Sequence, residues 1–270
     1  MTATTAATDF GAPEPARPAR AGRARRPVTA SGFRALLLMH IRLIRREPGV
    51  VLIVLIPVVL LVIFGTVPGA KKPQADLGGR SVLDVYVPTI AAMVPLMVSC
   101  TWLPAAMASF RERNALRRFA VSPVPAGGML AALVVVLSTM AILGVGLIIG
   151  LGLGVFGAKA PANLGAVISS FVLGFTAVMA VGMIAAAVAT SSGMANGFGM
   201  PFMILNFFFS GLYVPTAELP HVLRTVGEYV PFGAVTDAWA GQGSLWQHLV
   251  VLAGYTVCGS VVAAKLFRWE

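Results

Sequence analysis

Six long apolar segments dominate the sequence and decide what it can fold into. Each is close to or above the roughly 20 residues that a helix needs to cross the hydrocarbon core of a bilayer. They lie at residues 50–67, 85–109, 129–156, 164–190, 196–214 and 245–266. Hydrophobic residues make up 57% of the chain and charged residues only 11%, which does not suit a water-exposed surface. We therefore predict an all-α membrane protein with six transmembrane helices.

The basic residues are unevenly distributed among the segments that flank these spans. Nine arginines precede the first span, four lie between the second and third spans, and two basic residues lie at the C-terminal end. Only five lie in connections on the other side. Because basic residues are retained on the cytoplasmic side, both termini are predicted to be cytoplasmic. The net charge of +10 therefore reflects topology, and we expect no nucleic-acid partner.

The first part of the chain divides into two segments ahead of a transmembrane domain at residues 48–270. Residues 1–32 are rich in Arg, Ala and Pro and predict a disordered basic cytoplasmic tail. Residues 33–47 predict an amphipathic helix at the inner surface of the lipid bilayer, with a short soluble helix as the alternative. Its apolar residues recur at helical spacing, and its arginines fall on the other side: Phe33, Leu36, Leu37, Ile41 and Ile44 against Arg34, Arg42, Arg45 and Arg46.

Prolines and glycines inside the spans predict local breaks and close contacts. Pro57 predicts a kink in the first span. The second span must have interrupted hydrogen bonding, since it contains Pro88, Pro95 and Pro104. In the third span, glycines at four-residue spacing would let another helix approach closely: Gly146, Gly150 and Gly154.

The sequence carries no energy-converting or catalytic motif. It contains no Gly-Lys pair, so the phosphate-binding loop of an ATPase is excluded. The histidines His40, His221 and His248 are far apart, which predicts solvated side chains and no metal site. Ionisable residues are predicted to lie outside the span interiors, which disfavours proton-coupled transport. The chain is predicted not to be an enzyme, with neither catalytic residues nor a cofactor of its own.

Two segments between the spans carry distinctive residues. The first is basic and lies between the second and third spans, with Arg111, Glu112, Arg113, Leu116, Arg117, Arg118, Phe119 and Pro123. From charge alone, it could merely enforce topology. The second follows the fifth span and is too polar to cross the membrane and too apolar for a free loop, with Gly211, Pro215, Glu218, Pro220, Glu228 and Pro231.

These two segments resemble the signatures of bacterial ABC-2 type permeases. Arg111-Glu112-Arg113, Leu116-Arg117-Arg118-Phe119 and Ser122-Pro123 resemble that family's cytoplasmic loop, and Ser210-Gly211-Leu212-Tyr213-Val214-Pro215 resembles its second signature. The resemblance is closest to the daunorubicin-resistance type of antibiotic exporter. One departure is that Asn114 or Ala115 stands where the family often has glycine.

The resemblance implies a homodimer of permeases that works with two copies of a separate ATPase, which binds the ATP and Mg. It implies that residues 33–46 form a connecting helix, that residues 111–123 form a coupling helix on the ATPase, and that residues 216–237 form a re-entrant outer hairpin before the last helix. It also implies that the second and fifth spans line the transport path. The candidate path residues are Trp102, Asn206, Phe207, Phe208 and Phe209, with aromatic faces and one amide.

The sequence thus predicts the membrane subunit of an ABC exporter in a bacterial plasma membrane. Its cargo would be a hydrophobic or amphipathic molecule such as a drug or antibiotic, and antibiotic resistance would follow from efflux. Two alternatives remain open at this point. One is a secondary transporter, and the other is a non-transporting membrane scaffold or immunity protein.

Overall fold

The computed structural model describes residues 30–74, 79–112, 126–161, 163–213 and 219–267. Over these residues the structure consists of helices and loops, with a single isolated antiparallel bridge between Gln74 and Arg80. In chain order the helices are α1 (Ala30–Arg46), α2 (Pro48–Thr66), α3 (Val82–Met97), η2 (Val98–Trp102), α4 (Leu103–Glu112), α6 (Ala126–Gly154), α7 (Leu164–Val188), α8 (Ser192–Phe209), α9 (His221–Glu228), α10 (Pro231–Ala240) and α11 (Leu245–Leu266). The predicted all-α fold is confirmed.

Four of these helical segments are long and apolar enough to cross a membrane. They are Val82–Glu112, Gly127–Gly154, Leu164–Val188 and Leu245–Leu266, with 31, 28, 25 and 22 residues. The first of them is continuous through α3, η2 and α4. The other two predicted spans correspond to α2, with 19 residues, and α8, with 18 residues.

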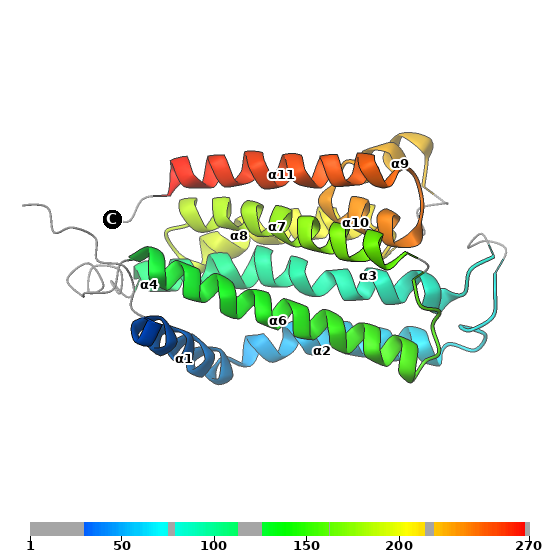
Figure 1. The fold of residues 1–270 in the computed structure, drawn as a ribbon, viewed down its shortest axis with the longest axis horizontal. Coiled ribbons are helices and arrows are strands. Elements are labelled where there is room, and N and C mark those ends of the chain that lie inside the picture. Colours follow the sequence, from blue (N-terminus) through cyan, green and yellow to red (C-terminus); the bar gives the residue numbers. More distant parts are fainter. Residues whose placement is uncertain (1–29, 75–78, 113–125, 162, 214–218, 268–270) are drawn as a thin grey trace, which may run out of the picture.

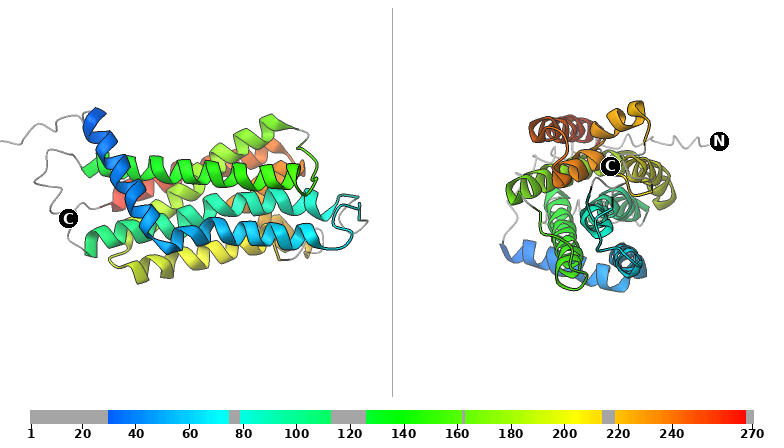
Figure 2. Two further views of the ribbon diagram at one scale, coloured as in Figure 1. Left: turned by 90° about the horizontal axis from the view of Figure 1, so that it is seen from below. Right: turned by 90° about the vertical axis from the view of Figure 1, so that its right-hand side faces the viewer.

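The helix that carries α3, η2 and α4 lies at the centre of the bundle. It contacts α2, α6, α7, α8 and α10, and Figures 1 and 2 show the long helices running side by side around it. The interruption predicted from its prolines is found as the π-helix η2, which lies between Pro95 and Pro104. The central helix is therefore straight enough to cross the bundle and locally irregular at its middle.

The close approach between α3 and α6 uses different glycines from those predicted. A Cβ on Gly144 would lie 2.7 Å from a Val94 methyl group, and one on Gly152 would lie 2.5 Å from a Val87 methyl group. At Gly146, Gly150 and Gly154 nothing lies within 4 Å of the corresponding position. The prediction was wrong for this chain's own helices, because positions eight residues apart share the face of α6 that meets α3.

Helix α1 crosses the end of the bundle at a steep angle to the other long helices (Figure 2). It packs mainly on α6, and Leu36 and His40 are its buried residues. The helix begins at Ala30, three residues before the predicted boundary, because the first turn tolerates Ser31 and Gly32 ahead of the apolar pattern. Ile41, which was expected on the apolar face, is 43% exposed.

The histidine of α1 is buried, which contradicts the prediction of a solvated side chain. The His40 ring meets Phe110 of α4 edge to face at 5.9 Å, and its Nδ1 lies 2.8 Å from the Leu36 carbonyl oxygen. Its Nε2 has no hydrogen-bond partner. Burial lowers the pKa of His40, so the neutral ring is favoured in this apolar contact.

Asp84 fixes the opposite end of the central helix. Ser81 and Asp84 form a capping box in which the Ser81 hydroxyl accepts from the Asp84 N–H at 3.1 Å and Asp84 Oδ2 accepts from the Ser81 N–H at 3.2 Å. Asp84 Oδ1 also accepts from the Lys159 N–H at 2.8 Å, which ties in the loop before α7. Pro88 has no N–H to donate to the Asp84 carbonyl oxygen, which instead accepts a hydrogen bond from the Arg80 side chain at 2.9 Å.

The glycine contacts between α3 and α6 predict a difference between two matched substitutions. Gly152→Ala forces a methyl group against Val87, whereas Gly150→Ala places the same methyl group in open space. Both gain the same helix propensity, so their difference isolates packing, and we expect Gly152→Ala to be the less stable by about 1–3 kcal/mol. Thermal unfolding in mild detergent measures this, and equal melting temperatures would contradict the packing.

Candidate coupling site

The predicted coupling segment begins at the end of α4, where two of its residues are described. Arg111 and Glu112 are the last two residues of that helix. The remaining predicted coupling residues lie outside the described residues: Arg113, Leu116, Arg117, Arg118, Phe119 and Pro123. The site is therefore built from Arg111, Glu112 and the helices that they contact.

Arg111 binds the C-terminal end of α7. Its Nη1 donates to the carbonyl oxygen of Ala186 and, at 2.7 Å, to that of Ala189, the C-cap residue of α7. The last carbonyls of a helix have no donor within the helix and carry the negative end of its dipole, so a guanidinium is well suited to them. The guanidinium also lies 5.4 Å from the centre of the Phe267 ring, near the end of α11.

Glu112 binds the N-terminal end of α8. Its Oε1 accepts from the Ser192 N–H at 2.9 Å, and its Oε2 accepts from the Ser192 hydroxyl at 3.1 Å. The preceding residue, Ser191, is the N-cap and accepts from the Met194 N–H at 3.2 Å. A carboxylate at this position satisfies a free N–H and faces the positive end of the helix dipole.

These two neighbouring side chains together hold the short connection between α7 and α8. We call Arg111 and Glu112, with their contacts to Ala186, Ala189 and Ser192, the Arg111–Glu112 clamp. The positive side chain meets the carbonyl end of one helix and the negative side chain meets the amide end of the next, so each charge is matched. The docking role predicted for this pair did not include these internal contacts. The Ser-Ser-Gly turn between the two spans is only a weak sign of them in the sequence.

The amide predicted to line the transport path is used inside the fold. Asn206 of α8 is fully buried, and its Nδ2 donates to the Phe202 carbonyl at 2.8 Å. Its Oδ1 accepts from the Phe232 N–H at 3.1 Å, at the first turn of α10. Both functional groups of the amide are therefore engaged, and Asn206 fixes the outer hairpin to α8.

The predicted aromatic residues of the path face different surroundings. Phe207 is buried and its ring lies 5.7 Å from that of Phe232, whereas Phe208 is 38% exposed and packs edge to face on Phe209. Trp102 is half-buried, and its indole lies 3.7 Å from the position that a Cβ on Gly49 would take at the start of α2. Phe208 and Phe209 thus remain near the surface of α8.

The predicted outer hairpin contains two short helices, α9 and α10. Gly211 has a positive φ of 78° and ends α8, Pro220 is the N-cap of α9, and Pro231 occupies the first turn of α10. The Glu228 carboxylate accepts from the Gln247 amide of α11 at 3.5 Å. Of the other predicted hairpin residues, Pro215 and Glu218 lie outside the described residues.

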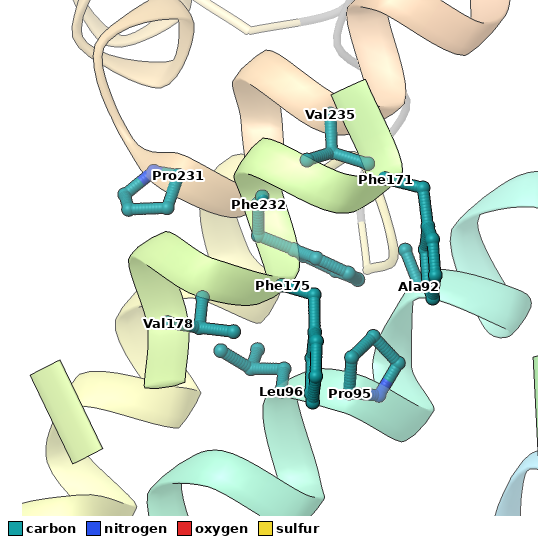
Figure 3. A pocket seen from close by; sticks show the side chains of 10 residues that line it. Ala92, Pro95, Leu96, Phe171, Phe175, Val178, Pro231, Phe232 and Val235 are labelled. Atoms are coloured by element: carbon teal, nitrogen blue, oxygen red, sulfur yellow. The ribbon is translucent and has the colours of Figure 1, made fainter. Parts of the chain in front are cut away.

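An apolar pocket lies between α3, α7 and α10, and Figure 3 shows its lining. It encloses about 280 Å³, including space that opens outward. Phe171 and Phe175 of α7 lie with nearly parallel rings at 6.2 Å. The lining residues are Ala92, Pro95, Leu96, Phe171, Gly174, Phe175, Val178, Pro231, Phe232 and Val235, and their side chains offer only carbon to an occupant.

The outer hairpin also contains a partly buried carboxyl group that the sequence did not single out as a site. Burial raises the pKa of Asp237 to about 6, with Glu228 acting in the same direction and His248 and Arg224 opposing it. His248 of α11 is 1% exposed, and its Nε2 lies 3.0 Å from the Gln242 carbonyl oxygen. The prediction that this histidine is solvated was therefore wrong.

The raised pKa of Asp237 predicts a pH-dependent contribution to stability. Because the folded protein holds this proton more tightly than the unfolded chain, the contribution is lost as the pH rises from 3.8 to about 6. Asp237→Asn, which removes the charge, should raise the melting temperature at pH 8 and have a much smaller effect at pH 4. A variant that melts lower than the parent protein at pH 8 would contradict the burial of this carboxylate.

The comparison with family models identifies what most of the chain is similar to. The family model described as "ABC-2 family transporter protein" matches residues 69–265, which is well over half of the chain. The match covers α3 to α11, and with them the clamp and the outer hairpin. A search of curated proteins found no match.

Proposed function

The chain belongs to the ABC-2 family of transporter proteins, and from this membership we propose that it is the membrane permease subunit of an ABC exporter. Membership makes it a multi-pass membrane protein that transports and associates with an ABC ATPase subunit. Our proposal adds that it moves a hydrophobic or amphipathic, drug-like molecule out of a bacterial cell. The ATP, with its Mg, would be bound and hydrolysed by the separate subunit.

The observation that carries this proposal is the Arg111–Glu112 clamp. The basic segment that follows α4 directly continues from the clamp, so a partner that pushes on this segment also pushes on α4. Through Ala189 and Ser192, the same push reaches the ends of α7 and α8. Movement of a cytoplasmic ATPase would thereby be transmitted to three helices at once, which is what a permease without its own ATPase requires.

The proposed topology has six membrane spans with both termini in the cytoplasm. It adds α2 and α8 to the four helices that meet the length and hydropathy of a span. At about 1.5 Å per residue their 19 and 18 residues reach roughly 27–29 Å, close to the thickness of the hydrocarbon core. The steep angle of α1 supports a position along the inner surface of the membrane (Figure 2).

An apolar cargo is supported by the surfaces available for it. The pocket between α3, α7 and α10 offers carbon side chains, and the exposed side of α8 presents Phe198, Ile204 and Phe208. In the proposed homodimer a second copy would face the α8 side, where Phe208 and Phe209 of the predicted path remain near the surface. Efflux of an antibiotic along this path would give resistance.

The test of the proposed function is to purify the tagged full-length protein gently from its native membrane and to identify what accompanies it by mass spectrometry. We expect a soluble subunit with a phosphate-binding loop in roughly stoichiometric amount. Recovery of the chain alone, under conditions that preserve other transporter complexes, would contradict the proposal.

The clamp predicts that two kinds of substitution fail in different ways. Charge reversal at Arg117 and Arg118, in the segment proposed to dock on the ATPase, should reduce copurification of that subunit. Glu112→Ala should leave the subunit bound while the ATP-dependent efflux of an aromatic dye falls by about threefold or more, because the two hydrogen bonds that join α4 to Ser192 are lost. Glu112→Ala with normal efflux, or with loss of the ATPase subunit, would contradict the assigned role.

A further inference from the structure

Three neighbouring helices are weakened at the same level of the bundle. In the central helix, η2 replaces regular α-helix, and Pro104 has no N–H to donate to the Cys100 carbonyl. In α8, Pro201 lies two residues after Gly199. In α7, Gly182 lies at the same level. Helices α7 and α8 are themselves continuous through these positions, and η2 contacts both of them.

The closest approaches between the three helices at this level involve backbone atoms. A Cβ on Gly182 would lie 2.0 Å from the Ser99 carbonyl oxygen, and a Cβ on Gly199 would lie 1.7 Å from that of Cys100. Only glycine permits such an approach, in which a Cα–H group faces a carbonyl that the π-helix leaves accessible. These backbone contacts lie within the main core, to which Val98, Cys100 and Leu103 also contribute buried side chains.

Below this level the same three helices continue to the inner end of the bundle, where Leu103, Met107 and Ala186 still belong to the main core. We call α4, residues 182–189 at the end of α7 and residues 192–199 of α8 the inner three-helix unit. Ala108, Ala189 and Ala195 form a buried cluster of their own at its centre, each with 0% exposure. The Arg111–Glu112 clamp closes its inner end.

We propose that the inner three-helix unit moves as one body and that η2, seated on Gly182 and Gly199, is its pivot. The proposal rests on the coupling role proposed above in one respect only, namely that the ATPase subunit causes the movement. The unit is held together at two places, by the alanine cluster and by the clamp, and its connection to the outer halves passes through the three weakened positions and the main core around them.

One buried group indicates that this arrangement of η2 is not fully satisfied. The Ser99 hydroxyl has 0% exposure and no hydrogen-bond partner. An unpaired buried hydroxyl costs free energy that another arrangement of the pivot can recover. The same position that bends most easily therefore also has a reason to adopt a second conformation.

The pivot is tested in the full chain, in lipid nanodiscs, with spin labels on two matched pairs of exposed positions. The inner pair is Val188→Cys at the inner end of α7 and Ala131→Cys in the inner half of α6. The outer pair is Val172→Cys and Leu147→Cys in the outer halves of the same two helices. We expect the distance distribution of the inner pair to be about twofold broader than that of the outer pair. Equal widths would overturn the pivot.

Two substitutions of proline sharpen the test. Pro104→Ala supplies the missing N–H to the central helix and should narrow the inner distribution to the width of the outer one. Pro57→Ala, the matched control in α2, should leave both widths unchanged. An inner distribution that Pro104→Ala does not narrow would overturn the proposal. The exposed Cys258 is replaced by serine for labelling, while the buried Cys100 is retained.

Repeating the measurement with the copurified ATPase separates the two proposals. A shift of the inner distance on addition of ATP, with the outer distance unchanged, supports both the pivot and the coupling role. Equal shifts in both pairs keep the coupling role and overturn the pivot. A broad inner distribution that ATP leaves unchanged supports the pivot and contradicts the coupling role.

Discussion

The structure depends on the requirement that a chain in lipid satisfies its backbone polar groups from within. Three prolines interrupt the central helix and leave carbonyls without their usual donors. Arg80 serves the Asp84 carbonyl, and the Cys100 carbonyl is covered by the Cα of Gly199. The same requirement applies to helix ends, where Arg111, Glu112 and Asn206 each supply a side chain to the backbone of another helix. Polar side chains in this protein thus serve mainly to complete the backbone.

The contacts of these polar side chains define where the proposed coupling path runs. The ends of α7 and α8 need a cation and an anion respectively, and the last two residues of α4 provide them in that order. A pair of residues that completes two helix ends also joins them mechanically to α4. Stability and transmission of movement therefore rest on the same contacts, so the family's basic loop begins at a structural joint.

The sequence predicted the local features well, because apolar length and turn residues determine them. The last helix occupies residues 245–266 as predicted, and the interruption of the second span was evident from Pro95 and Pro104. Contacts between distant segments could not be predicted in this way. Glu112 and Ser192 are 80 positions apart, and no local pattern indicates that they meet. The burial of His248 and the engagement of the Asn206 amide were missed for the same reason, since both depend on the outer hairpin folding back.

We propose that the clamp carries movement from the ATPase to the connection between α7 and α8. Amide hydrogen exchange of residues 186–195 in the reconstituted complex tests it most directly, with and without an ATP analogue that is not hydrolysed. We expect the analogue to change the exchange of these residues in the parent protein and to have no effect on them in the Glu112→Ala variant. The same change in both proteins would contradict it.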